Sequence, residues 1–256
     1  MYAFRAVETH EELRACRRIR YSVYCERKGW LAAGRHATQE ESDDFDAGSE
    51  HFAALDATGR IVGTVRLILA SRLLEPLPIT HHPAVVGAPP PTADSAEISR
   101  LCVSAPARNF NIELGLYRLI YRACKSRRLA HCYIVVDATF LDLLNRLGFG
   151  FVPLGPPTDY FGGRTVPARC DPADVDAGLR VANPALYEWL QEPPSRLEGT
   201  RLLQRFLVRQ RGHARDAISL RPLPLEVPCP STSSSSSGIP AMSPLPFSSG
   251  SEGLAS

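Results

Sequence analysis

Two opposite charges stand three positions apart in a segment that otherwise has the pattern of a buried strand. In the stretch Ala96-Glu97-Ile98-Ser99-Arg100-Leu101-Cys102-Val103 the aliphatic residues favour a β-strand, yet Glu97 and Arg100 interrupt it. Burying either charge alone would cost several kcal/mol. We therefore expect each charge to pair with the other, to pair with a charge elsewhere in the chain, or to contact a ligand.

Four more charged residues stand where they can supply such partners. Arg20 lies near the apolar stripe of an expected helix, and Arg66 lies between two apolar residues of an expected strand. Asp43 and Asp46 flank Phe45 in an acidic segment. Acidic loops are usually solvated, but an aromatic residue inside one indicates that the loop folds over something.

The periodicity of apolar side chains predicts the elements that position these residues. Helices are expected at about 10–27, 113–128, 139–148, 173–181, 185–191 and 196–209, the first opened by a capping box formed by Thr9 and Glu12 and the third opened by Thr139. Strands are expected at about 2–7, 52–56, 61–69, 96–103, 132–136 and 149–154, with an irregular proline-rich excursion at 76–91 and loops at 155–157 and 161–164. This order predicts an α/β or α+β sandwich with helices packed on a mixed sheet.

Composition limits the classes of protein to consider. With 256 residues and 44% apolar content the chain can bury a sizeable core, and a formal charge of +2 is too small to indicate nucleic-acid binding. The seven cysteines include no C-x-x-C pair, which is typical of reduced core thiols rather than a disulfide framework or a zinc site. We expect no metal, no secretion signal, no membrane span and a cytoplasmic location.

The last part of the chain differs in composition from the rest. Apolar periodicity ends near Arg211, and the residues that follow are rich in proline and serine, including the segment Ser231–Ser237. Such a sequence cannot bury a core. We expect one folded domain over residues 1–210 and a disordered Pro/Ser-rich tail over residues 211–256.

Five short motifs, in one order and at compatible spacing, resemble those of the acyl-homoserine-lactone synthases of the LuxI type, a branch of the GNAT acyltransferases. They are Arg20-Tyr-Ser-Val-Tyr24, Gly29-Trp30, Ser42-Asp43-Asp44-Phe45-Asp46, Val65-Arg66 and Glu97-Ile-Ser-Arg100. Each motif alone is weak, and their joint order carries the signal.

A closer likeness is to the GNAT proteins called PEP-CTERM/exosortase-system-associated acyltransferases, which are related to N-acyl amino acid synthases. It covers about residues 2 to 190. The residues that carry it are Tyr21-Ser-Val-Tyr-Cys-Glu26, Gly63-Thr-Val-Arg-Leu67, Ala96-Glu-Ile-Ser-Arg-Leu101 and Leu154-Gly-Pro156, with Tyr160 and Arg164.

The resemblance implies a GNAT-like fold, a twisted mixed β-sheet with helices on both faces. Its sheet would be splayed between the fourth and fifth strands, here those of Glu97 and Val135. The pantetheine arm of an acyl thioester would lie in the splay, where backbone groups can pair with its amides.

The expected donor follows from a departure from the ordinary GNAT pattern. GNAT enzymes hold the coenzyme A pyrophosphate on a glycine-rich turn, and Arg108-Asn-Phe-Asn-Ile-Glu-Leu-Gly115 lacks the glycine pair. Acyl-carrier protein, which presents a phosphopantetheine thioester without that pyrophosphate, is therefore the expected donor and partner, with acyl-CoA as the alternative. No bound cofactor is expected.

The resemblance implies acyl transfer to an amine, which requires a base. Glu97 is the expected catalytic base, acting directly or through water; the alternative is that it only partners Arg20 or Arg100. Cys102 invites a nucleophile interpretation, but no histidine stands near it in sequence. The residues expected to shape the pocket of a small amine acceptor are Arg20, Tyr24, Trp30, Asp43, Asp46, Arg66, Arg100, Tyr160 and Arg164.

Three functions remain open. The first is an N-acyltransferase that moves a fatty acyl group from an acyl thioester to the amine of an amino acid or similar small acceptor. The second is an acyl-homoserine-lactone synthase that uses S-adenosylmethionine, and the third is a non-catalytic acyl-binding relative. The basic sets considered for docking an acidic carrier protein are Arg122, Lys125, Arg127 and Arg128, or Arg201, Arg205 and Arg209.

Overall fold

The computed structural model describes residues 2–86, 90–107 and 110–192. The tail at 211–256, the expected helix at 196–209, Cys229 and the second basic set lie outside these residues, so those expectations stay predictions.

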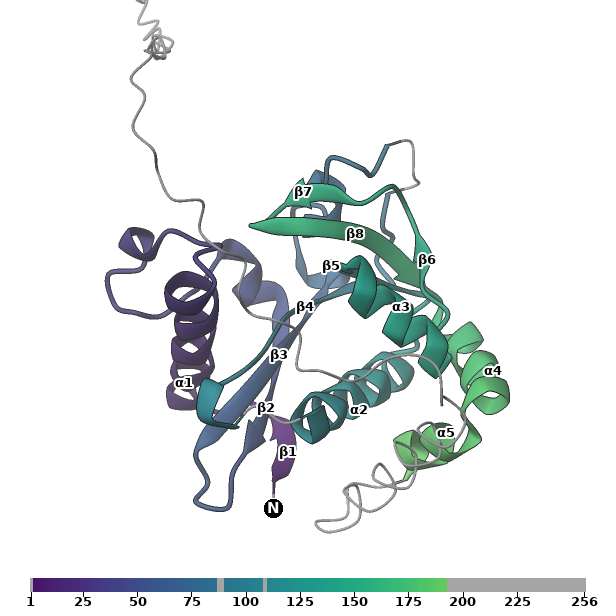
Figure 1. Cartoon of the computed structure of the whole chain (residues 1–256), viewed down its shortest axis with the longest axis horizontal. Helices are drawn as coiled ribbons and strands as arrows, with labels where there is room; N and C mark the ends of the chain where they lie inside the picture. The colour runs from purple at the N-terminus through teal and green to yellow at the C-terminus, as the bar shows by residue number, and fades with distance from the viewer. Residues whose placement is uncertain (1, 87–89, 108–109, 193–256) are drawn as a thin grey trace, which may run out of the picture. The chain divides into compact units, whose positions relative to one another are not determined.

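Strands and helices are interspersed along the described chain (Figure 1). The strands are β1 Ala3–Ala6, β2 Ser49–Leu55, β3 Ile61–Leu69, β4 Ser95–Val103, β5 His131–Asp137, β6 Val152–Pro153, β7 Thr158–Tyr160 and β8 Gly163–Cys170. The α-helices are α1 His10–Tyr21, α2 Phe110–Ser126, α3 Ala138–Leu147, α4 Pro172–Ala182 and α5 Pro184–Gln191. The expected mixed α/β architecture is confirmed.

The strands form one sheet in the order β1-β2-β3-β4-β5-β8-β6, with β7 paired to β8. All neighbours are antiparallel except β4 and β5, which run parallel. Their pairing extends from Ser95 opposite His131 to Ile98 opposite Ile134 and stops there, although both strands continue. Beyond Ile98, β4 stays with β3 and β5 stays with β8. The sheet is therefore splayed between β4 and β5, as expected.

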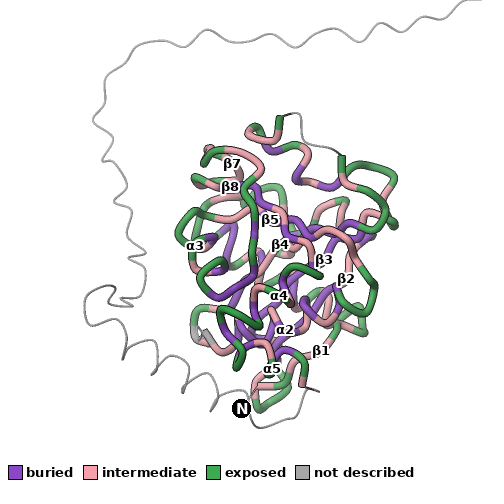
Figure 2. Tube along the Cα trace, turned by 90° about the vertical axis from the view of Figure 1, so that its right-hand side faces the viewer, coloured by how far each residue is buried: buried purple, intermediate pink, exposed green. Residues whose placement is uncertain are grey.

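The two faces of the sheet carry different side chains. On β3, Val65 and Leu67 belong to the main apolar core with Ile112 and Leu116 of α2. Arg66, between them, points to the opposite face and contacts groups beside α1. This alternation follows from the two-residue period of a strand. Figure 1 shows α1 and α2 on opposite sides of β3, and Figure 2 shows how fully the central strands are buried.

Helix α1 begins with the capping box that its sequence predicts. The Thr9 side chain accepts from the Glu12 amide, and the Glu12 carboxylate accepts from the backbone amide of Thr9. The expected helix continues to Arg27, but its last part, Ser22–Arg27, is a π-helix. A π-turn offsets the side chains that follow it, and such turns often occur at functional sites. This one carries Tyr24.

A β-bulge in β4 redirects its charged residues. Between the pairs Thr64/Cys102 and Arg66/Ser99, β3 advances two residues while β4 advances three. Strand β4 therefore has one extra residue in this stretch, and the stretch contains Arg100, which has a left-handed φ of 54°. In a regular strand, Glu97 and Arg100 would point to opposite faces. Because of the bulge, both side chains reach the face of α1.

Three expectations about the second half of the chain need correction. The strand expected at 149–154 is only β6, and the stretch around Phe161-Gly-Gly-Arg164, expected as a loop, is the turn and start of the hairpin β7–β8. Strand β8 was missed because Pro167 and two arginines hide the alternation of its buried residues. Helix α3 is capped by Asp137, whose side chain accepts from Phe140 N, so Thr139 lies inside the helix.

Candidate active site

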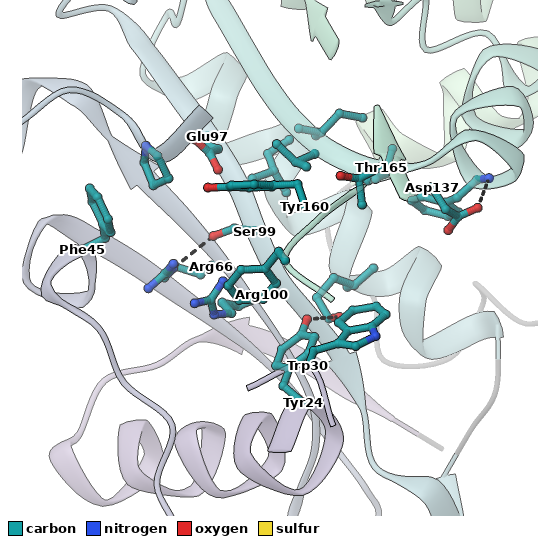
Figure 3. A pocket seen from close by; sticks show the side chains of 18 of the residues that line it. Tyr24, Trp30, Phe45, Arg66, Glu97, Ser99, Arg100, Asp137, Tyr160 and Thr165 are labelled. Atoms are coloured by element: carbon teal, nitrogen blue, oxygen red, sulfur yellow. Dashed lines mark hydrogen bonds between the residues drawn. The ribbon is translucent and has the colours of Figure 1, made fainter. Parts of the chain in front are cut away.

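A cavity of about 1150 Å³ passes through the splay between β4 and β5. On the α1 face it is lined by charged and aromatic residues of the segment from Tyr24 to Phe45 and of β3 and β4 (Figure 3). On the α2 face its lining becomes apolar, with residues of α2, β5 and α3. We call these two parts the charged end and the apolar arm.

Behind the wall of the charged end, Arg20 of α1 is fully buried. Its guanidinium donates to Glu41 and, at 2.8 Å, to Oδ1 of Asp46. Burial disfavours the charge of Arg20, but the two carboxylates outweigh it and raise its pKa. Arg17 adds a further contact to Asp46, at 3.2 Å. Arg20 and Asp46 therefore hold the network together without lining the cavity.

Arg66 joins this buried layer to the cavity wall. Its Nη1 donates to Asp43 and, at 2.7 Å, to Asp46, and its Nη2 donates to Asp43 at 3.0 Å. Its Nε donates to Oγ of Ser99 at 3.0 Å. All three nitrogens of this guanidinium are engaged, so the group is rigidly oriented.

Arg100 completes the network on the cavity side. Its Nη2 donates to Asp43 at 2.9 Å, and its Nε donates to Glu41 at 3.2 Å. Three arginines and three carboxylates thus form one continuous cluster, with Glu41 and Asp43 each bridging two arginines. The expected contacts of Arg66 and Arg100 with the acidic segment are present.

The arginines fix the carboxylates in the charged state. Burial alone would raise the pKa of Asp46, but Arg20 and Arg66 hold it at about 2. Burial likewise opposes the charge of Asp43, and Arg66 and Arg100 still lower its pKa. These side chains are therefore permanent anions at neutral pH and unsuited to accept a proton from a substrate.

Glu97 stands apart from this network. It is 4% exposed and lines the cavity, and its Oε2 accepts from the amide of Ile79 at 2.6 Å. Burial raises its pKa to about 7, although the Ile79 amide, Arg66 and Arg100 act in the opposite direction. Within the described chain it forms no ion pair. The alternative that Glu97 only partners Arg20 or Arg100 is therefore wrong, because those arginines bind Glu41, Asp43 and Asp46.

Aromatic side chains cover the charged end. Trp30 stacks on Tyr24 with ring centroids 5.7 Å apart, and the Tyr24 hydroxyl donates to the Leu101 carbonyl at 2.9 Å. Tyr160 lies next to Glu97 (Figure 3) and contacts the His82 ring at 4.7 Å. Arg164 is exposed at the rim of the cavity. The expected site residues Tyr24, Trp30, Tyr160 and Arg164 all line the cavity. His82 does not line it but contacts the Tyr160 ring.

Three residues of this site were not anticipated as site residues. Glu41 is buried and bridges Arg20 and Arg100; it was visible only as one member of the acidic run. Phe161 lies beside Arg100 at the tip of the β7–β8 hairpin, which was not anticipated. His82 is buried and bonded to Thr165 at 3.2 Å. Its position in a proline-rich segment gave no signal of burial.

Cys102 does not have the properties of a nucleophile. Its thiol is buried, and burial raises its pKa to about 12. Its Sγ contacts the Arg100 carbonyl at 3.6 Å.

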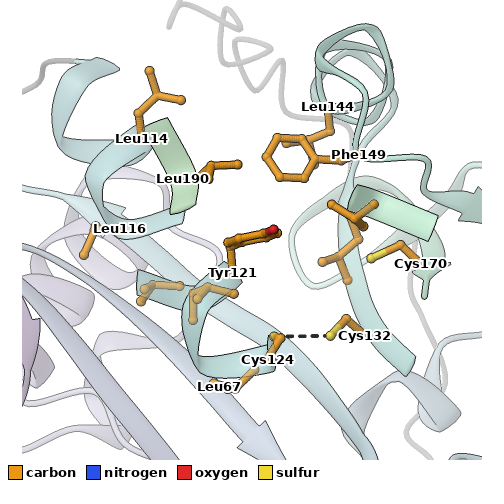
Figure 4. Close-up of a cluster of buried hydrophobic side chains, with 14 of the residues drawn as sticks. Leu67, Leu114, Leu116, Tyr121, Cys124, Cys132, Leu144, Phe149, Cys170 and Leu190 are labelled. Carbon is orange, nitrogen blue, oxygen red and sulfur yellow. Dashed lines mark hydrogen bonds between the residues drawn. The ribbon is translucent and has the colours of Figure 1, made fainter. Parts of the chain in front are cut away.

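The apolar arm is lined by residues of the apolar core, several of which, such as Cys124, Cys132 and Leu144, are drawn in Figure 4. Its lining includes Tyr117, Ile120 and Cys124 of α2, Ile134 and Val136 of β5, and Leu144 of α3. Its inner end is lined by Cys124 and Cys132, whose Sγ atoms are 3.3 Å apart, together with Cys170, Pro172 and Val175. Of the lining side chains on α2, β5 and α3, only that of Asp137, exposed at the end of β5, carries a charge. Tyr117 and Cys124 are two helical turns apart, so the arm extends about 10 Å along α2.

Two further observations concern the described part of the chain. No group of three or more His, Cys, Asp or Glu side chains there is arranged to hold a metal ion. No helix in the same residues is long and apolar enough to cross a membrane.

Part of the chain matches a known protein family. Residues 19–118 match the family model described as the acetyltransferase (GNAT) domain. The chain therefore has a GNAT-like fold. The matched residues contain the arginine–carboxylate network, Glu97 and the first part of α2. No curated protein matches the sequence.

Solved structures share the GNAT fold at low sequence identity. The CoA-dependent acyl-homoserine lactone synthase BjaI, solved with SAM and isopentyl-CoA, gives a TM-score of 0.61 at 20% identity, over 81% of this chain and 100% of that chain. The AHL synthase LasI gives 0.58 at 18%, over 71% and 94%. FeeM, an N-acyl amino acid synthase from uncultured soil microbes, gives 0.54 at 16%, over 71% and 97%. At these identities the likeness establishes the fold alone.

Proposed function

We propose that this GNAT domain is an N-acyltransferase that moves a fatty acyl group from an acyl thioester to the amine of an amino acid or similar small acceptor. One observation carries the proposal. Glu97, a buried carboxylate with a pKa of about 7 and no cationic partner in the described chain, lies where the charged end meets the splay. Such a group is poised to accept a proton near neutral pH.

The reaction needs one proton transfer and one displacement. Glu97, directly or through water, takes a proton from the acceptor amine, and the nitrogen attacks the thioester carbonyl. The C–N bond forms and the C–S bond breaks. The departing sulfur receives a proton, so the products are an amide and the free thiol of the donor. Asp43 and Asp46 cannot replace Glu97 as the base because their arginine partners lower their pKa values.

The charged end suits an acceptor that carries a carboxylate as well as an amine. Arg100 is 13% exposed, and its Nη1 has no hydrogen-bond partner among the described residues. Arg164 lines the same end and forms no ion pair with the described residues. Two cations with unused donors favour an anionic group. Glu97, on the same face, would then be left to the amine.

The donor is assigned to the splay and the apolar arm. The pairing of β4 with β5 stops at Ile98 and Ile134, which leaves edges of both strands free to bond the amides of a pantetheine arm. The apolar arm then takes the acyl chain. Acyl-carrier protein is the proposed donor because the segment before α2 lacks the glycine pair of a pyrophosphate loop. Acyl-CoA is the competing donor, and BjaI is described as CoA-dependent.

Carrier-protein docking at the end of α2 is disfavoured by the contacts found there. Lys125 binds Asp176 at 2.7 Å, Arg127 binds Glu50 at 2.5 Å, and Arg122 donates to the Glu192 carbonyl at 2.6 Å. These residues already have partners within the chain. The end of α2 also lies at the inner end of the apolar arm, whereas a carrier must approach the splay. The rim cations Arg35 and Arg164 are the better candidates.

Transfer assays with defined donors and acceptors test the proposal. Octanoyl-acyl-carrier protein and octanoyl-CoA are each incubated with the purified chain and either the common amino acids or S-adenosylmethionine. We expect thiol release only with an amino acid present, and mass spectrometry should identify an N-octanoyl amino acid. Octanoyl homoserine lactone as the product would instead establish the synthase alternative. Absence of thiol release with either donor would support a non-catalytic acyl-binding protein.

The same question can be asked in cells. Lipid extracts from cells that overproduce the chain should contain an N-acyl amino acid that is missing from cells producing Glu97→Gln. Equal amounts in both extracts would contradict the proposed role of Glu97.

A further inference from the structure

The tip of the β7–β8 hairpin is built in a specific way. Tyr160 pairs with Gly163, so Phe161 and Gly162 form a two-residue turn. Their φ angles are 52° and 78°, both left-handed, which is the geometry of a type I′ turn. Glycine adopts this conformation readily, but a bulky aromatic residue does so at a cost. The presence of Phe161 at this position therefore calls for a compensating contact.

The hairpin tip packs against the opposite wall of the cavity. A Cβ added to Gly162 would lie 2.4 Å from Cδ1 of Trp30, so only glycine fits there. Trp30 in turn stacks on Tyr24. The tip belongs to the β5–β8 half of the splayed sheet, whereas Tyr24 is bonded to β4. This contact therefore bridges the two halves across the charged end.

The compensating contact of Phe161 is with Arg100. The Arg100 guanidinium carbon lies 4.5 Å from the centroid of the Phe161 ring and 5.8 Å from that of Tyr24. The Phe161 and Tyr24 rings meet edge to face at 6.4 Å. A guanidinium at this distance over an aromatic face is attracted by the ring quadrupole, and more strongly where water is excluded.

Hydrogen bonds alone leave the Arg100 guanidinium free to tilt about one axis. Its Nε and Nη2 bind Glu41 and Asp43, so both bonds lie along one edge of the guanidinium plane. The plane can still tilt about that edge, which would move Nη1 toward or away from the cavity. The Phe161 ring, whose centroid lies 4.5 Å from the guanidinium carbon, limits this tilt by contact with the group.

We infer that Phe161 is a positioning residue for acceptor binding: its ring fixes the Arg100 guanidinium so that Nη1 faces the carboxylate of the acceptor. This inference rests on the proposed function, because it takes the acceptor to be an amine with a carboxylate. It assigns the hairpin a part in acceptor selection.

Two substitutions separate ring stacking from simple packing. Phe161→Leu keeps a large apolar side chain but removes the aromatic face. Phe161→Tyr keeps the face. The probes are N-octanoylglycine, a product analogue with a carboxylate, and N-methyloctanamide, which has the same amide and chain without one. Calorimetric binding of both probes to wild type and the two variants is measured, with melting temperatures to confirm folding.

Wild type should bind N-octanoylglycine more tightly than N-methyloctanamide. In Phe161→Leu this preference should fall about tenfold, while binding of N-methyloctanamide stays unchanged. Phe161→Tyr should retain the preference. In transfer assays Phe161→Leu should raise the acceptor KM and leave kcat within about twofold.

The inference is overturned if Phe161→Leu keeps the full carboxylate preference, or if Leu and Tyr variants lose it equally. The binding readout also separates this inference from the proposed function. A chain that prefers the carboxylate in a Phe161-dependent way but transfers no acyl group would keep the positioning role and refute the activity. If the chain transfers acyl groups but the Phe161→Leu variant keeps the full carboxylate preference, the proposed activity stands and the positioning role of Phe161 is refuted.

Discussion

The charged end and the apolar arm belong to one cavity but are stabilised by opposite means. At the charged end each carboxylate of the network has at least two arginine contacts, so the buried carboxylates are held by opposite charges. The apolar arm is lined mainly by uncharged side chains that depend on close packing. The first region is therefore sensitive to a change of charge, and the second to a change of volume.

Glu97 lies at the boundary and follows neither pattern. It is buried like Glu41, yet Glu41 accepts from two arginines and Glu97 accepts only from the Ile79 amide among the described residues. The pKa of Glu97 is raised to about 7, whereas that of Asp46 in the network is held at about 2. Carboxylates in one site thus serve different purposes. Those of the network are fixed charges, whereas Glu97 can exchange a proton.

The largest expected effect comes from removing the carboxylate that accepts the proton. Glu97→Gln keeps the shape of the side chain but cannot accept a proton from the amine. We expect kcat to fall roughly 10²- to 10⁴-fold, with the octanoyl donor still bound and the melting temperature retained. The wild-type rate should rise with pH through about 7 as Glu97 loses its proton, and the variant should lack that step.

The matched control for this prediction is Glu188→Gln, the same change on the exposed surface of α5, which should leave the rate unaltered. A Glu97→Gln variant that transfers acyl groups at the wild-type rate would remove Glu97 as the base.

The next effect concerns the fixed charges. Arg20→Met preserves length and apolar volume but leaves Glu41 and Asp46 buried with fewer partners. Uncompensated buried charge of this kind costs about 3–5 kcal/mol, so the denaturant midpoint should shift strongly. Arg14→Met, on the exposed side of the same helix, removes a surface pair with Glu40 and should cost about 0–1 kcal/mol. Equal losses of stability in the two variants would show that the buried network is no more sensitive to the loss of a charge than the surface of the same helix.

The pH dependence of stability distinguishes Glu97 from the carboxylates of the arginine network. The pKa of Glu97 is raised from 4.5 to about 7 on folding, so the folded state binds a proton that the unfolded state has released between these values. Wild type should therefore lose stability as pH rises from about 5 to 8, on the order of 1–3 kcal/mol. Glu97→Gln should not show this loss. Equilibrium unfolding at several pH values tests it, and parallel curves for the two proteins would be the contrary result.

The sequence revealed much of the charged end because charge in an apolar pattern is visible without a structure. Glu97, Arg66 and Arg100 were found in this way, and the capping box fixed the start of α1. The pairing among them was not predictable, because the β4 bulge that brings Glu97 and Arg100 to one face has no sequence signal.

The apolar arm and the hairpin were harder to predict. The residues of the arm have the pattern of ordinary core residues, since nothing in an apolar stripe shows that the sheet beside it is splayed. The sequence predicts a loop at Phe161 because the strand after it contains Pro167 and two arginines. The proposed role of Phe161 beside Arg100 depends on a turn geometry that only the structure shows.

The smallest expected effect concerns volume at the inner end of the arm. Cys124→Phe adds a ring where the arm ends, beside Cys132. The arm extends about 10 Å along α2, so the added ring should exclude the end of a longer acyl chain and leave a short chain unaffected. We expect kcat/KM to fall about tenfold for octanoyl relative to butanoyl donors. Cys124→Ala, which widens the same place, should shift the preference toward dodecanoyl donors.

Stability separates this effect from general damage to the core. Adding a ring to a filled core typically costs about 1–3 kcal/mol, whereas a ring that enters an existing cavity should cost less. The melting temperature of Cys124→Phe should therefore stay close to that of the wild type. If catalysis falls equally for butanoyl and octanoyl donors, the acyl chain does not occupy the arm. In that case the arm is only a packing defect of the core, and the division of the cavity into a reacting end and an acyl end is wrong.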